Sequence, residues 1–399
     1  MKVLIIHNFY QIAGGEDAVF ENESTLIQDS HDVEHYVVDN DHINSFLGKL
    51  TAALGVVFSV NQYRKLKAKL IETKPDIVHI HNYFPVLSPA IFYACKSLNI
   101  PVVHTLHNYR AICPTALLMH DGKVDEKSIH QGPWWAISKR VYRGSLIGTM
   151  LLATMISWHR FIGTWQRKVD RFIALTEFQK SKYIEAGWPA EKIAVKPNFV
   201  NDPFKDCEMP EKAGGYAIFV GRLSQEKGID ILLESWRTVN YPLKIIGDGP
   251  LKSLVEQSNN NNIEYLGKKE KPELFELVRN ADFIVMPSTW YEGFPMVLVE
   301  AFACGTPAVV SNLGSMAEIV TPNETGLHFT VGNSIELSSR INEILSDRAT
   351  LMLMGENARA NYLTRYTNEQ NLQKLMTIYH DAIASSQVSS AKNMSHKGR

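Results

Sequence analysis

The sequence predicts an α/β protein made of two doubly wound domains, each built around a parallel sheet. The chain has 399 residues, which exceeds what one hydrophobic core usually serves. Short apolar runs alternate with helical segments along the chain, as they do in parallel sheets. The stretch from Pro197 to Gly215 is rich in proline, asparagine and glycine and lacks periodicity, which predicts a linker. We therefore expect two domains facing each other across a cleft, with ligands at the carboxyl ends of the strands.

Strands are expected wherever short, buried-type apolar runs are bounded by turn residues. In the first half these runs are Lys2–Ile6, Glu34–Val38, Asp76–Ile80, Pro101–Thr105, Arg171–Leu175 and Ile193–Lys196. In the second half they are Tyr216–Val220, Leu243–Ile246, Ile263–Leu266, Asp282–Met286 and Pro307–Val310. The serine-rich residues 385–399 are expected to be disordered.

Composition excludes several classes of protein. Hydrophobic residues make up 45% and charged residues 21% of the chain, which is typical of a folded globular protein. A net charge of −1 argues against a nucleic-acid partner. The cysteines are scattered, without metal-ligand pairs or a disulfide framework, so a reduced, cytoplasmic setting is expected (Cys95, Cys113, Cys207 and Cys304). The first ten residues indicate a buried strand and not a signal peptide, and no run reaches the ~20 apolar residues of a membrane span.

The stretch from Met286 to Pro307 combines the features of an anion site. A strand leads into a loop, Pro287–Phe294, and a helix begins at Pro295, whose missing N–H suits a first turn. The free N–H groups and positive dipole of such a helix attract phosphate. Glu292 lies in the loop, and Glu300 lies ~7.5 Å along the helix from its start at ~1.5 Å per residue. Two carboxylates can therefore reach different parts of one ligand.

Two acids eight positions apart, with Gly293, Phe294 and Pro295 after the first, resemble the signature of glycosyltransferase family 4, whose members are retaining enzymes of the GT-B fold. The resemblance implies that Glu300 holds the ribose of a nucleotide-sugar and that Glu292 faces the donor sugar. It also implies that the diphosphate lies at the N–H groups near Met296 and Val297. A solvated loop acid and a helix-surface acid are the alternative.

Arg222 and Lys227 follow the first strand of the second half in the sequence GRLSQEKG. A guanidinium clamps phosphate oxygens, and a lysine adds a mobile positive charge. The spacing resembles that of family 4, in which both cations neutralise the diphosphate leaving group. The loop around Ser315 departs from the family, because many relatives have glycine there.

In the first half, Gly14 and Gly15 form a strand-to-helix turn that is not the dinucleotide fingerprint. By resemblance they would lie beneath the diphosphate. His107 lies at the carboxyl end of a strand and matches a family histidine that meets the donor sugar and phosphate. An imidazole can also change charge near neutral pH. His79 and His81 are interpreted as structural.

Residues 127–169 contain no acid but carry several basic residues and tryptophans around an uncharged run. This pattern is typical of an interfacial anchor on an anionic membrane, and a buried helix with solvated cationic ends is the alternative.

The resemblance covers nearly the whole chain to about Ile383. The predicted domains are an N-terminal acceptor domain, 1–197, and a nucleotide-sugar domain, 198–367. By family analogy a helix at 368–384 crosses back to the first domain.

We therefore expect a retaining transferase that moves a sugar from a nucleoside diphosphate sugar to a glycan or lipid-linked acceptor in cell-envelope polysaccharide synthesis. It would be cytoplasmic, either free or peripheral on the inner face of the plasma membrane. No cofactor is expected, and the lack of an Asp-x-Asp motif at a strand end predicts no metal. A nucleotide-sugar epimerase and a non-catalytic binding protein are the alternatives.

Overall fold

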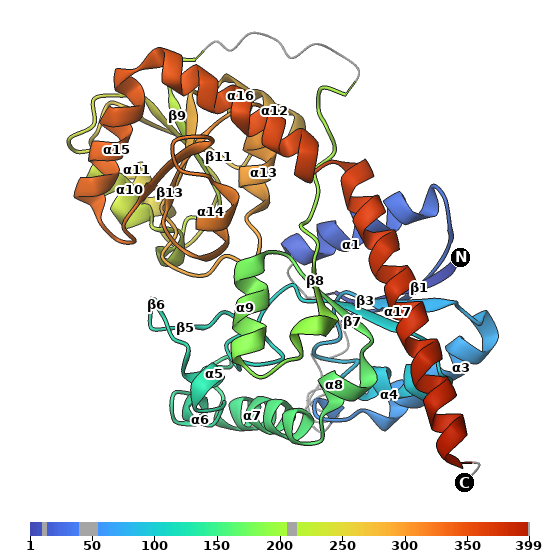
Figure 1. Cartoon of the computed structure of the whole chain (residues 1–399). Coiled ribbons are helices and arrows are strands. Elements are labelled where there is room, and N and C mark those ends of the chain that lie inside the picture. The colour runs from blue at the N-terminus through green and yellow to red at the C-terminus, as the bar shows by residue number, and fades with distance from the viewer. Residues whose placement is uncertain (10–13, 40–54, 206–213, 398–399) are drawn as a thin grey trace. The chain divides into compact units, whose positions relative to one another are not determined.

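The computed structural model describes residues 1–9, 14–39, 55–205 and 214–397, with side chains described as far as residue 388 (Figure 1). The chain divides into two compact units. The first contains Met1–Leu118, Asp125–Lys196 and Leu372–Arg399, and the second contains Met119–Val124 and Pro197–Asn371. Each unit has its own six-stranded parallel sheet with helices on it, which confirms the predicted α/β fold of two doubly wound domains.

The first unit begins with a strand and alternates strands with helices to residue 196. Its strands are β1 (Lys2–Asn8), β2 (Asp32–Val38), β3 (Ile77–Ile80), β4 (Val102–Thr105), β7 (Arg171–Ala174) and β8 (Ile193–Val195). Its helices are α1 (Gly15–Gln28), α3 (Val60–Thr73), α4 (Ala90–Ser97), α5 (Lys127–His130), α6 (Trp135–Ser138), α7 (Leu146–Phe161), α8 (Thr164–Lys168), α9 (Glu177–Glu185) and the 3-10 turn η2 (Ala190–Lys192). Helix α17 (Asn368–Lys397) starts in the second unit and belongs to the first from Leu372.

The strands of the first sheet are ordered β2-β1-β3-β4-β7-β8. Its central strands are buried on both faces, as expected when helices cover a parallel sheet on each side. On one face, Phe20 of α1 and Leu375 and Tyr379 of α17 pack against Val3 and Ile77. Figure 1 shows α17 running across this sheet. The C-terminal helix is therefore part of the core of the first unit.

The second unit repeats the alternation. Its strands are β9 (Ala217–Val220), β10 (Leu243–Ile246), β11 (Ile263–Gly267), β12 (Phe283–Met286), β13 (Ala308–Ser311) and β14 (Gly326–Phe329). Its helices are α10 (Ile229–Ser235), α11 (Lys252–Glu256), α12 (Lys271–Asn280), α13 (Met296–Ala303), α14 (Gly314–Ile319), α15 (Ser334–Ser346), α16 (Arg348–Arg365) and the 3-10 turn η3 (Gln225–Lys227). A hairpin of two residues per strand, β5 (Met119–His120) and β6 (Lys123–Val124), also belongs to this unit.

The second sheet has the order β11-β10-β9-β12-β13-β14, in which the chain runs outward in both directions from β9 and β12. Helices α13, α14 and α16 bury one face, and α10 and α15 bury the other. The boundary between β9 and β12 is the topological switch point, where the following loops diverge and open sheets of this kind bind ligands.

Three features differ from the predictions. Strand β14 was not predicted, because it is only four residues long, begins with Gly326 and has a short apolar run. The hairpin β5–β6 lies within predicted domain 1–197 but packs with the second unit. The expectation of disorder at 385–399 is wrong as far as Lys397, because α17 continues to that residue. From Asn368 to Lys397 the sequence contains neither glycine nor proline, so nothing terminates the helix.

Candidate active site

The candidate site of the second unit lies at the switch point of its sheet. Arg222 and Lys227 follow β9, and Glu292 follows β12, the neighbouring strand. Because both strands are parallel, their carboxyl ends share one edge of the sheet. The loop carrying Glu292 is also tied to the turn carrying Lys227, since the amide of Thr289 donates to the carbonyl of Glu226 at 2.9 Å. The tertiary fold therefore joins two motifs that are about 65 residues apart.

Three glycines allow these loops to approach one another closely. A Cβ at Gly228, whose φ is +71°, would lie 2.1 Å from the carbonyl oxygen of Pro287. A Cβ at Gly247, with φ of +141°, would lie 1.8 Å from the carbonyl oxygen of Gly221. Gly249 is similarly confined by the backbone of Leu223. Side chains at these positions would push the loops after β9, β10 and β12 apart.

Glu292 is the centre of a charge-assisted hydrogen-bond cluster. Its Oε1 accepts from Nζ of Lys227 at 2.7 Å, from Oγ of Ser288 at 2.7 Å and from Nε1 of Trp290 at 2.9 Å. The residue is 5% exposed, so these donors replace the water that a buried carboxylate loses. Its Oε2 has no hydrogen-bond partner among the described residues. One oxygen is fixed by protein donors, and the other remains available to a ligand.

Ser315 holds the same loop from the side of α14. Its buried hydroxyl lies 2.9 Å from the carbonyl oxygen of Glu292 and 3.2 Å from that of Gly293, and donates to this pair. The departure from family 4 at this position therefore has a structural role, because glycine would leave both carbonyls without this donor. Phe294 anchors the end of the loop, with its ring 6.2 Å from that of Tyr366 in the core.

Helix α13 begins one residue later than predicted, at Met296, with Pro295 as its N-cap. The amides of Met296 and Val297 are first-turn groups that have no intrahelical acceptor. The side-chain carboxylate of Glu300, on the same helix, forms no hydrogen bond or ion pair with the described residues, and only the backbone carbonyl of Glu300 accepts, from the amide of Cys304 at 3.2 Å. Burial raises the pKa of Glu300, although Lys271 opposes the rise. A half-buried carboxylate without a side-chain partner, close to the start of a helix, is suited to bind a ligand that supplies hydrogen-bond donors such as hydroxyl groups.

Arg222 differs from Lys227. Its side chain is exposed, and it forms no ion pair with the residues that the structure describes. Its backbone is fixed, because the flanking Gly221 and Leu223 donate to the carbonyls of Ile246 and Asp248. The guanidinium is therefore a free cation on a rigid loop.

In the first unit, Gly14 and Gly15 are exposed at the start of α1, at the carboxyl end of β1. The N-cap amide of Gly14 donates to Oδ2 of Asp17 at 2.8 Å. The neighbouring Glu16 accepts from Nδ2 of Asn82 at 3.1 Å and from Nδ2 of Asn108 at 3.3 Å. Burial, followed by the charge of Asp17, raises the pKa of Glu16 to about 7.

His107 lies where predicted, after β4, and its Nε2 is 3.1 Å from Nδ1 of His81. Since β3 and β4 are neighbours, the two rings stack, with centroids 5.3 Å apart. Burial, followed by the neighbouring histidines and Lys196, lowers the pKa of His107 well below its ordinary value. The lowered pKa favours the neutral form of the ring over the charge change near neutral pH that the sequence suggested.

His79 and His81 are fully buried, as their structural interpretation requires. His79 bonds the hydroxyls of Tyr379 at 2.7 Å and Thr105 at 2.8 Å, which ties α17 to the sheet. Ligand atoms of Glu23, His79 and His81 lie within 4.8 Å of one another, a spacing compatible with a metal. However, Nζ of Lys196 is 2.9 Å from Oε2 of Glu23, and this buried ammonium disfavours a second cation.

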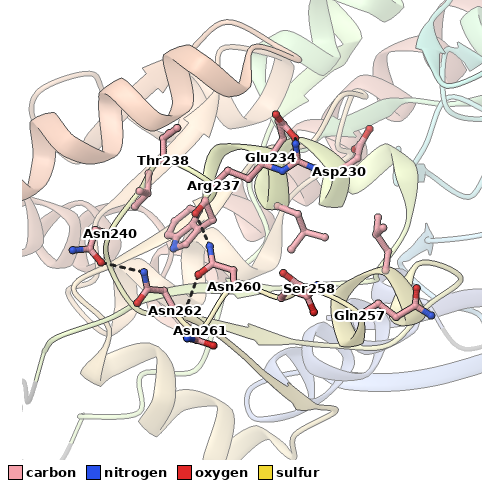
Figure 2. A pocket seen from close by; sticks show the side chains of 15 residues that line it. Asp230, Glu234, Arg237, Thr238, Asn240, Gln257, Ser258, Asn260, Asn261 and Asn262 are labelled. Atoms are coloured by element: carbon pink, nitrogen blue, oxygen red, sulfur yellow. Dashed lines mark hydrogen bonds and ion pairs between the residues drawn. The ribbon is translucent and has the colours of Figure 1, made fainter.

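A hollow of about 1090 Å³ lies in the second unit away from these residues (Figure 2). It is lined by α10, α11 and an asparagine-rich loop. Three of the amides labelled in Figure 2 already bond within the protein: Asn260 donates to the carbonyl of Trp236 at 2.6 Å and Asn262 to Asn240 at 3.2 Å. This basin contains none of the predicted site residues.

The structure brings together Arg222, Lys227, Glu292 and the α13 residues within the second unit, and Gly14, Gly15 and His107 at strand ends of the first. Sequence reasoning missed Ser288 and Trp290 and noted Ser315 only as a departure from the family. Ser288 and Trp290 stand within four residues of Glu292, and that proximity was the available signal. It also missed Glu16, although it directly follows the glycine pair.

Two parallel six-stranded sheets, with cations and a helix start at the strand ends of the second, define the GT-B class of glycosyltransferase. Solved structures agree with this fold. The HepE protein of Anabaena, crystallised in complex with UDP, superposes with a TM-score of 0.67 at 18% identity over 95% of this chain and 99% of that one. Sucrose-phosphate synthase of Thermosynechococcus elongatus gives a TM-score of 0.68 at 18% identity over 96% of this chain and 99% of that one.

The chain belongs to the GT4-type glycosyltransferases. The family model described as Glycosyltransferase Family 4 matches residues 29–203, and that described as Glycosyl transferases group 1 matches residues 208–361. The uncharacterised glycosyltransferase MJ1178 of Methanocaldococcus jannaschii is 25% identical over 96% of this chain and 98% of its own length. An uncharacterised 42.6 kDa protein from the cps region of Klebsiella pneumoniae is 28% identical over 64% of this chain and 62% of its own length.

Proposed function

We propose that this glycosyltransferase transfers a sugar from a nucleoside diphosphate sugar to an acceptor hydroxyl, with retention at the anomeric carbon and without a metal ion. The observation that carries the proposal is the arrangement at the switch point of the second sheet. There a free guanidinium, an ammonium at hydrogen-bond distance from Glu292 and the first turn of α13 follow adjacent strands. The HepE complexes with UDP and UDP-glucose support a nucleotide-sugar donor.

In the proposed reaction, the bond between the anomeric carbon and the β-phosphate oxygen breaks as the acceptor oxygen bonds to the same face of that carbon. The acceptor proton passes to the departing phosphate oxygen. Negative charge grows on the diphosphate while the sugar ring becomes cationic. Arg222, Lys227 and the amides of Met296 and Val297 would stabilise that charge, and preorganised stabilisation of this kind is usually the largest catalytic contribution.

The remaining residues are assigned to donor recognition. The free Oε2 of Glu292 would accept a sugar hydroxyl, and Glu300 would accept both ribose hydroxyls. A neutral His107 can donate one hydrogen bond to the sugar or phosphate, and Gly14 and Gly15 would allow close approach of the diphosphate. Metal independence follows from the cations that already offset the diphosphate charge. Activity retained in EDTA, with added Mg²⁺ as control, tests this assignment.

For the acceptor we propose a glycan or lipid-linked glycan of a cell-envelope polysaccharide, made at the cytoplasmic face of the membrane. Support comes from similarity to the protein encoded in the cps region of Klebsiella pneumoniae. Transfer to small-molecule acceptors, with no transfer to free or lipid-linked glycans, would contradict it.

The first experiment is a thermal-shift screen of the whole chain against nucleotide-sugars, beginning with UDP-sugars. A ligand at about 100 times its Kd adds ~2.7 kcal/mol to the free energy of unfolding. The stabilising donor is then incubated with acceptor glycans, and the anomeric configuration of the product is assigned by NMR. An inverted product overturns retention. Release of nucleoside diphosphate without acceptor would favour an epimerase-type reaction, and binding without any turnover would favour a binding protein.

A further inference from the structure

The outward face of α7 is apolar, although it is exposed. Ile147 is 63% exposed, Trp158 50% and Phe161 84%, and Leu146 and Met150 are exposed by more than 40%. The buried face is mostly apolar as well, and it holds Leu152, Ala153, Met155 and Ile156 beside the polar Thr149 and His159. At ~100° per residue the exposed side chains fall within an arc of about 120°, opposite most of the buried ones. Helix α7 therefore presents a second apolar stripe that the first unit does not cover.

Cations surround both ends of this stripe. Lys139, Arg140 and Arg143 precede the helix, and Arg160 and Arg167 lie at and beyond its C-terminal end. All five are exposed, and none forms an ion pair with the residues that the structure describes. Residues 127–169 contain no aspartate or glutamate. The positive charge of these five side chains is therefore not offset by a carboxylate among the described residues, and an external anion could offset it.

Two exposed tryptophans lie in the same segment of the chain. Trp134, 52% exposed, precedes α6, and Trp158 lies in the last turn of α7. Indole rings favour the boundary between headgroups and acyl chains. Helix α7 has 16 residues and so is ~24 Å long, shorter than a bilayer core of about 30 Å. None of the helices that the structure describes is long and apolar enough to span a membrane.

We propose that the α7 surface, defined as Trp134, the exposed face of α7 and the five flanking cations, lies on an anionic lipid membrane. The apolar stripe would enter the headgroup boundary, and the arginines and lysine would meet lipid phosphates. A second copy of the chain is a poorer occupant. A symmetric dimer through α7 would bring the same five unpaired cations against one another.

This surface goes beyond the proposed function and does not depend on it, because vesicle binding is measured without donor or acceptor. If the transfer reaction fails while binding stands, the membrane inference is unaffected. If both stand, the surface would hold the enzyme where lipid-linked acceptors are found.

The test is co-sedimentation of the full chain with vesicles of phosphatidylcholine alone and of phosphatidylcholine mixed with phosphatidylglycerol. We expect binding to the anionic vesicles only, weakening as salt is raised. Trp158→Ser with Phe161→Ser should weaken binding at least tenfold, because both exposed rings lose apolar contact. Lys139→Gln, Arg143→Gln and Arg160→Gln together should weaken it roughly 100-fold, since each cation contributes about fivefold.

The matched control variants make the same types of substitution at exposed residues of the second unit. Ile335→Ser with Met352→Ser removes exposed apolar residues of the second unit. Arg237→Gln, Lys252→Gln and Arg340→Gln remove three cations there. Both controls should bind as the wild type does. The inference is overturned by an absence of wild-type binding, by equal losses in variants and controls, or by a dimer in light scattering that Trp158→Ser with Phe161→Ser disperses. Circular dichroism verifies that each variant is folded.

Discussion

Nζ of Lys227 lies 2.7 Å from Oε1 of Glu292, so a cation from the loop after β9 is paired with an acid from the loop after β12. The pair is largely buried, with side-chain exposures of 19% and 7%. Removing one member of such a pair leaves the other as an uncompensated charge. When a diphosphate binds, however, Lys227 could exchange the carboxylate of Glu292 for a phosphate group. The same contact thus holds the ligand-free loops together and keeps an ammonium ready at the switch point.

Replacing both Arg222 and Lys227 with alanine should reduce kcat by about 10² or more, because the departing diphosphate loses its charge-stabilising donors. Steady-state kinetics with the donor found by thermal shift measure the effect. Arg237→Ala with Lys252→Ala is the control, since both are cations of the same unit outside the site. Near-native turnover in the double variant of Arg222 and Lys227 would remove the phosphate assignment.

Ser288→Ala should reduce kcat roughly tenfold, because a hydrogen bond to a charged group contributes about 1.5–3 kcal/mol and Glu292 would lose one of its protein donors. Affinity for the nucleoside diphosphate should change little, since that part of the donor does not contact Glu292 in our proposal. Ser235→Ala removes a buried serine that bonds a helix carbonyl in the same unit, and it should leave kcat unchanged. A larger effect on diphosphate affinity than on kcat would contradict the assignment of Glu292 to the sugar.

Glu300→Gln should make the free protein more stable at neutral pH and the donor complex weaker. Burial raises the pKa of Glu300, so the folded state favours its protonated form, and the ionised form costs stability above the ordinary pKa. As pH falls through the raised pKa towards 4.5, the wild type should therefore recover stability relative to the variant. Melting temperatures across pH measure this difference.

The ribose role of Glu300 is tested with a 2′,3′-dideoxy nucleoside diphosphate. The wild type should prefer the natural ligand, and Glu300→Gln should bind both ligands about equally. Equal preference in the two proteins would place the ribose elsewhere.

Glu16→Gln should stabilise the protein above pH 7. The pKa of Glu16 is about 7 in the folded state, against an ordinary value of 4.5, so ionised Glu16 costs at most about 3 kcal/mol at high pH. The cost should disappear as pH falls from 7 to 4.5, where the folded and unfolded states both hold the proton. Urea unfolding at several pH values checks this, with Glu177→Gln on the exposed first turn of α9 as control. A constant difference across pH would rule out titration of Glu16 as the cause.

Much of the fold was predictable because parallel sheets require short, continuous apolar runs, and those runs are visible in the chain. Each predicted strand has a counterpart within about two residues of its bounds, as with Leu243–Ile246 in β10. The hairpin β5–β6 could not be predicted, because its pairing involves two residues per strand and has no apolar periodicity.

The sequence by itself determined the alternation of strands and helices, the acids and cations of the site, and the unbalanced charge of residues 127–169. These are properties of residue type and spacing. Only the tertiary structure decided which groups meet. It paired Lys227 with Glu292, turned Ser315 towards the carbonyls of Glu292 and Gly293, and stacked His107 on His81. Such contacts depend on strand order and on glycines that admit another loop's backbone, and strand order is set by packing across the whole sheet.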